Sequence, residues 1–173
     1  MNYSEIKFTD IANGEGVRVS LFVSGCRRRC KNCFNRSAWD FASGEPFTEE
    51  VQEKILAALA PDFIAGLSLL GGDPFEPENQ RALLPFVQEV KNRYPNKNIW
   101  CYTGYTYHNG AICEPQANTE VTRALISCLD VLVDGPFIEE KKDIRLKFRG
   151  SSNQRVIDIK RSLESGKIKL YLE

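Results

Sequence analysis

Residues Val17–Phe34 read VRVSLFVSGCRRRCKNCF, and this stretch holds the first predicted strand together with the most informative motif of the chain. The mostly apolar run Val17–Val23 favours a β-strand. That strand leads directly into a loop (residues 24–34, the cysteine loop) in which Cys26, Cys30 and Cys33 have the spacing C-x3-C-x2-C. The motif therefore predicts a metal site of three thiolates placed at the end of a strand.

The number of cysteines in the loop indicates the kind of metal site. Tetrahedral zinc sites and electron-transfer iron–sulfur clusters usually take four protein ligands. No fourth cysteine lies near the loop, so three thiolates around a four-iron cluster leave one iron without a protein ligand. An iron of that kind can bind and react with a small molecule, which favours a catalyst over an electron carrier. A non-catalytic iron–sulfur or zinc module stays open as the alternative; it needs a fourth ligand, and nothing brings the single histidine, His108, near Cys26.

Composition limits the class of protein. The chain has 173 residues, of which 42% are hydrophobic and 27% are charged, and we expect one domain spanning residues 1–173. Its 23 basic and 23 acidic residues cancel, which argues against a general nucleic-acid binder. We find no signal peptide and no apolar run long enough to cross a bilayer, so we expect a cytoplasmic protein. Its six cysteines are then expected to be thiols or metal ligands.

The chain alternates between predicted strands and helices. The predicted strands after the first are short and apolar, and they lie near residues 67–70, 98–102, 130–133 and 155–159, with a terminal strand or tail at 167–172. The predicted helices begin after Thr48, which we expect to be an N-cap, near Glu78, and after Asn118 or Thr119. Pro85 predicts either a kink in the second helix or a later start near Leu84.

A βα series of this kind predicts a mostly parallel sheet with right-handed crossovers. Five or so units are too few for a full eight-unit barrel, so we expect an α/β fold in the form of a partial, open βα barrel. The motifs follow the strands, namely the cysteine loop, Gly71–Pro74, Tyr102–Tyr105 and Asp134–Phe137. The carboxyl ends of parallel strands share one edge of the sheet, so these loops are expected to converge.

With these motifs the chain resembles the radical S-adenosylmethionine (SAM) superfamily, of which C-x3-C-x2-C is the signature. Asn13–Arg18 is similar to the Gly-x-Gly-x-Arg segment of glycyl-radical activases, and Gly71–Pro74 is similar to the Gly-Gly-Glu-Pro element, with Asp in place of Glu. More narrowly, the chain resembles the activating proteins of the anaerobic ribonucleoside-triphosphate reductase. The segments that carry this narrower resemblance are Trp100–Tyr105, Val133–Phe137 and Phe148–Arg155.

The resemblance implies an oxidoreductase in which Cys26, Cys30 and Cys33 hold a [4Fe-4S] cluster whose open iron binds SAM. Reductive cleavage of SAM would then generate a glycyl radical on the large subunit of the reductase. The residues implied to bind SAM are Asn32, Cys33, Phe34, Gly71, Gly72, Asp73, Thr103, Asp134 and Asn153. In the superfamily the residue just before the third cysteine is usually aromatic, whereas here it is Asn32, which leaves open how the adenine is held.

The basic residues Arg27, Arg28, Arg29 and Lys31 are expected to form either a solvated face or a docking surface for an acidic, flavodoxin-like electron donor. Cys101, Cys113 and Cys128 are expected to be ordinary thiols. A different radical SAM enzyme acting on a small molecule stays open as an alternative function, and the oligomeric state stays open as well.

Overall fold

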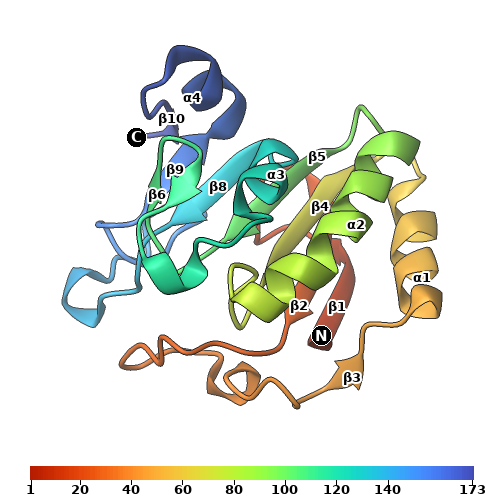
Figure 1. The fold of residues 1–173 in the computed structure, drawn as a ribbon, viewed down its shortest axis with the longest axis horizontal. Coiled ribbons are helices and arrows are strands. Elements are labelled where there is room, and N and C mark those ends of the chain that lie inside the picture. Colours follow the sequence, from red (N-terminus) through yellow and green to blue (C-terminus); the bar gives the residue numbers. More distant parts are fainter.

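The computed structural model describes residues 1–173, and its main element is an eight-stranded sheet of order β10-β9-β8-β5-β4-β2-β1-β3 (Figure 1). Strands β2 (Val17–Val23), β4 (Ile64–Gly71), β5 (Asn98–Tyr102) and β8 (Val131–Asp134) are parallel and form its centre. Antiparallel strands lie at both edges. They are β1 (Asn2–Asp10) and β3 (Glu45–Pro46) on one side, and β9 (Arg155–Asp158) and β10 (Leu170–Leu172) on the other.

The helices pack against one face of this sheet. Their bounds are α1 (Glu49–Leu59), α2 (Pro77–Arg93), α3 (Thr122–Ser127) and α4 (Ile159–Ser165). Alternation along β2 explains the arrangement, because Val19, Leu21 and Val23 enter the main core while Arg18 and Ser20 face the other side of the sheet. Figure 1 shows α2 lying along β4, with α1 beside it. None of the helices combines the length and the apolar composition that a membrane span requires.

The opposite face carries a smaller apolar cluster. Trp100, Val131, Val133 and Val156 form it, and Phe148 packs edge-on against Trp100 with ring centroids 5.1 Å apart. This face also contains buried polar side chains, and it leads to the edge of the sheet where the motif loops lie. The smaller elements of the chain are β6 (Tyr107–His108), β7 (Ala111–Ile112) and the 3-10 helices Arg36–Ala38, Pro115–Ala117 and Glu139–Lys141.

Several predicted elements are confirmed. The side chain of Thr48 accepts a hydrogen bond from the backbone N–H of Val51 and caps α1. Helix α2 begins at Pro77 and continues through Pro85 to Arg93, so the later start near Leu84 was wrong. Pro77 suits the first turn of a helix, where no intrahelical partner for an N–H is needed.

Two expectations about the sheet and helices need correction, and one strand was missed. Strand β1 was not predicted, because only its last residue is buried and its side chains show little apolar alternation. Strand β9 is antiparallel to β8, because the chain between them contains no crossover helix. Helix α3 starts at Thr122 with Val121 at its N-cap, and the Thr119 hydroxyl accepts from the Val121 N–H ahead of the helix.

Candidate functional site

A cleft of about 410 Å³ lies at the carboxyl ends of the central strands. All four motif loops contribute to its lining, so the predicted convergence is confirmed. The lining residues from these loops are Cys26, Arg28, Cys30, Cys33, Phe34, Gly71, Gly72, Asp73, Tyr102, Thr103, Gly104, Gly135 and Phe137. Strands far apart in the chain therefore bring the cysteines and the Gly-Gly-Asp turn to one cavity.

The cysteine side of the cleft is a loop without helix or strand. The N–H of Cys33 donates to the carbonyl of Cys30 at 3.1 Å, and Arg29 and Asn32 adopt left-handed backbone conformations with φ of 48° and 57°. All six cysteines are free thiols, and no three His, Cys, Asp or Glu side chains are gathered closely enough to hold a metal ion. Burial, with the nearby charge of Asp73, raises the pKa of the Cys26 thiol to about 12, so metal binding there must release a proton.

The chemistry of the donor set fits a cluster with one open position. Three thiols face a single cleft, and neither His108 nor any of Cys101, Cys113 and Cys128 lines it. His108 is exposed on β6, while Cys101 is buried in the main core. The cleft is therefore lined by three cysteines, without a fourth cysteine or a histidine.

The Gly-Gly-Asp turn packs directly against the cysteine loop. A Cβ on Gly72 would lie 2.5 Å from the carbonyl oxygen of Gly25 and 2.8 Å from that of Ala38, so only glycine fits there. The N–H of Gly72 donates to the carbonyl of Val23 at 2.7 Å, and that of Asp73 donates to the carbonyl of Gly25 at 2.8 Å. The turn thus fixes where the cysteine loop begins.

Asp73 joins the turn after β4 to the loop after β5. Its carboxylate accepts hydrogen bonds from the Phe75 N–H (2.9 Å), the Thr103 hydroxyl (2.8 Å) and the Gly104 N–H (2.8 Å). Desolvation by complete burial raises the pKa of Asp73 to about 7, although these hydrogen bonds lower it and the charge of Glu76 adds to the rise. The structure therefore brings Asp73 and Thr103, two residues of the implied set, together.

Three residues of the implied set do not line the cleft. Asp134 is buried, and its carboxylate accepts from the N–H of Tyr107 and pairs with Arg155. The side-chain amide of Asn153 donates to the carbonyl of Pro136 at 2.8 Å. Asn32 is exposed on the cysteine loop.

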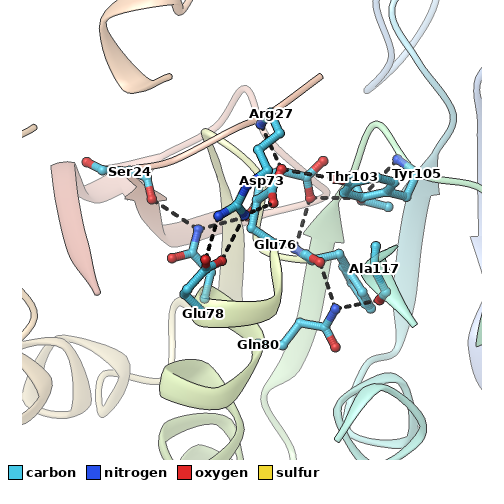
Figure 2. Close-up of polar contacts among 11 residues, drawn as sticks. Ser24, Arg27, Asp73, Glu76, Glu78, Gln80, Thr103, Tyr105 and Ala117 are labelled. Carbon is cyan, nitrogen blue, oxygen red and sulfur yellow. Dashed lines mark hydrogen bonds and ion pairs between the residues drawn. The ribbon is translucent and has the colours of Figure 1, made fainter. Parts of the chain in front are cut away.

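A buried glutamate next to the cleft was not identified from the sequence. Glu76 is fully buried, and its carboxylate contacts both Arg27 of the cysteine loop and Tyr105 after β5 (Figure 2). In the sequence Glu76 looks like an ordinary acidic residue near a helix start. Its position between Phe75 and Pro77 was the only local sign that it could be buried.

Two of the four basic residues of the cysteine loop are already paired with carboxylates of this chain. Arg27 pairs with Glu76 and Glu78, and Arg28 lies 3.5 Å from the carboxylate of Glu114 with its guanidinium over the Tyr105 ring. Arg29 and Lys31 are exposed and have no carboxylate partner. The basic surface is therefore smaller than the sequence suggested.

Comparison with known proteins gives a consistent result. Residues 12–157 match the family described as a 4Fe-4S single cluster domain. A Pasteurella multocida protein is 46% identical over 89% of this chain and 95% of its own length, and an Escherichia coli K12 protein is 40% identical over 90% and 97%. A protein of enterobacteria phage T4 is 37% identical over 90% of this chain and 93% of its own length. Each of the three carries the name anaerobic ribonucleoside-triphosphate reductase-activating protein.

Proposed function

We infer the function of this chain from its family: it belongs to the anaerobic ribonucleoside-triphosphate reductase-activating proteins, and it contains their 4Fe-4S domain. We propose that it activates an anaerobic ribonucleoside-triphosphate reductase. When bound, the [4Fe-4S] cluster supplies the electron for reductive cleavage of SAM, and through it a glycyl radical on the reductase. The observation that carries this proposal is one cleft shared by three cysteines and the Gly-Gly-Asp turn.

In this proposal Cys26, Cys30 and Cys33 hold the cluster through their sulfurs. They line the same cleft as the Gly-Gly-Asp turn, so the cluster and the cofactor would share one cavity. A cluster ligand must be a thiolate, so the loop has to lose three thiol protons on metal binding.

The cofactor-binding role is proposed for the residues that line the cleft, namely Phe34, Gly71, Gly72, Asp73 and Thr103 together with the backbone of Cys33. The two glycines line the cavity, and Asp73 joins the turn that carries them to the loop after β5. Asn32, Asp134 and Asn153 belong to the proposed site as bordering residues. The contacts of Asp134 and Asn153 support a role in holding the chain around Gly135 and Pro136.

The fold and the surroundings complete the proposal. We propose that residues 1–173 form one domain in which the sheet is a partial, open barrel, with helices outside and the cleft on the inner face. An open cleft suits a glycine-bearing peptide loop of the reductase large subunit. The exposed Arg29 and Lys31 suit an acidic, flavodoxin-like donor. Six free thiols support a reducing, cytoplasmic location.

The test uses protein reconstituted with iron and sulfide in the absence of oxygen. We expect about four irons per chain, SAM cleavage under a strong reductant, and a glycine-centred electron paramagnetic resonance (EPR) doublet after mixing with the reductase large subunit. Cys26→Ser, Cys30→Ser and Cys33→Ser should each lose the cluster, whereas Cys113→Ser, which is exposed outside the cleft, should keep it. Stoichiometric zinc without SAM turnover would favour the zinc-module alternative.

A further inference from the structure

We propose that Glu76 is a positioning residue that holds the first part of the cysteine loop in place before any metal binds. Its Oε1 accepts from the backbone N–H of Arg27 at 2.7 Å, and its Oε2 accepts from the guanidinium of the same residue at 2.6 Å. Arg27 directly follows Cys26, so a side chain 49 residues further along the chain fixes the peptide unit that joins a proposed ligand to the rest of the loop (Figure 2).

The position of Glu76 allows this role. Its backbone lies at the N-cap of α2, and its carbonyl accepts the first helical bond, from Gln80 N–H at 2.9 Å. Its side chain makes no capping bond to its own helix and turns instead to the cysteine loop. Pro77 removes one N–H that would otherwise compete for the carboxylate.

Burial makes the contact strong and specific. The Glu76 side chain is 1% exposed, while its partner Arg27 is 53% exposed and reaches solvent and Glu78. A buried carboxylate is tolerated when its oxygens are paired, and here the Tyr105 hydroxyl donates to Oε1 at 3.0 Å as well. All three groups around Glu76 donate, so the site requires a side chain that only accepts.

The two ends of the cysteine loop differ in how they are held. Around Cys26 the backbone is fixed from several sides, because Gly25 N–H donates to Ala38 carbonyl (2.7 Å) and Cys26 N–H donates to Trp39 carbonyl (3.1 Å). At the other end, the backbones of Cys30 and Cys33 make only one backbone hydrogen bond, which runs from the Cys33 N–H to the Cys30 carbonyl. We therefore infer that Cys26 is preset and that Cys30 and Cys33 move to meet the metal; this step rests on the proposed function of the three cysteines.

The first experiment measures the metal-free full chain, so it does not depend on the proposed function. Glu76→Gln keeps the shape of the side chain but places an amide N–H₂ against either the Arg27 N–H or its guanidinium. Amide hydrogen exchange at residues 26–28 should accelerate by about tenfold or more, the size expected for losing a hydrogen bond to a charged group. Exchange in the core of β4 should change much less. The matched control is Glu78→Gln, which removes the half-exposed partner of the same arginine and should leave loop exchange within about twofold.

The second experiment measures the cluster. Reconstituted Glu76→Gln should bind less iron, and the EPR spectrum of its reduced cluster should change in shape, while Glu78→Gln matches the wild type. If Glu76→Gln protein folds poorly, Arg27→Ala serves in its place: it removes the guanidinium contact but keeps the bond from the backbone N–H of residue 27, so exchange at residues 26–28 should accelerate by less than about tenfold but more than in Glu78→Gln. Equal loop exchange in Glu76→Gln and Glu78→Gln would overturn the proposal. Faster exchange in Glu76→Gln with normal iron content and an unchanged EPR spectrum would overturn it as well.

Discussion

Replacing Arg18 by lysine should destabilise the protein strongly although the charge is kept. Arg18 is fully buried, and its guanidinium donates to the Ser68 hydroxyl (2.7 Å) and to the carbonyls of Glu15 (3.0 Å), Leu67 (2.8 Å) and Asn98 (3.3 Å). A single ammonium group cannot reach four acceptors arranged around a planar fork, so two of them should lose their donor. At about 1.5–3 kcal/mol for each hydrogen bond to a charged group, the expected loss for two such bonds is about 3–6 kcal/mol.

The assay is urea unfolding of the metal-free protein, followed by tryptophan fluorescence. The matched control is Arg145→Lys, because the Arg145 side chain is 87% exposed and pairs with Asp143 at the surface; its cost should stay below about 1 kcal/mol. The loop before β2, whose residues Ala12 and Asn13 line the cleft, should also become more accessible to proteases in the Arg18 variant. A cost below about 1 kcal/mol for Arg18→Lys would refute the view that this guanidinium connects β2, β4 and β5.

Three further predictions concern other parts of the molecule. Gly72→Ala should lower the free energy of unfolding by about 1–3 kcal/mol, since backbone atoms crowd the new methyl group, and should weaken iron binding. The control Gly166→Ala lies in open space at a left-handed position and should leave iron binding intact. Burial would raise the pKa of Asp130, but hydrogen bonds from two lysines and a backbone N–H outweigh burial and lower that pKa. The ionised Asp130 therefore stabilises the folded protein above pH 3.8, and this stabilisation is lost as the pH falls below that value. Asp130→Asn should therefore reduce the acid-induced fall in the urea midpoint. Phe34→Ala should leave the melting temperature unchanged, because this side chain is 92% exposed, yet should weaken SAM binding in calorimetry.

Each of these three has an outcome that contradicts it. Full iron binding by Gly72→Ala would show that the turn yields to a methyl group. An unaltered acid profile in Asp130→Asn would mean that other carboxylates dominate acid unfolding. Unchanged SAM affinity in Phe34→Ala would remove this aromatic side chain from the proposed cofactor site.

Local patterns in the sequence were sufficient for the central strands, for the Thr48 cap and for the convergence of the motif loops. Apolar runs, capping residues and turn glycines act over a few positions, so they can be recognised without knowing what they pack against. Strand β1 and the antiparallel direction of β9 were missed for the complementary reason. An edge strand with exposed side chains has little apolar pattern, and strand direction depends on what the connecting chain does in space.

The candidate site divides in the same way. The spacing of Cys26, Cys30 and Cys33 predicts by itself a site of three thiolate ligands, because ligand type and number are properties of the chain. Only the tertiary structure decided that the Asp134 carboxylate pairs with Arg155 and that the Glu76 carboxylate accepts two hydrogen bonds from Arg27 of the cysteine loop. Whether a carboxylate binds a ligand or a neighbouring guanidinium depends on which donors folding buries beside it, and those donors come from distant parts of the chain.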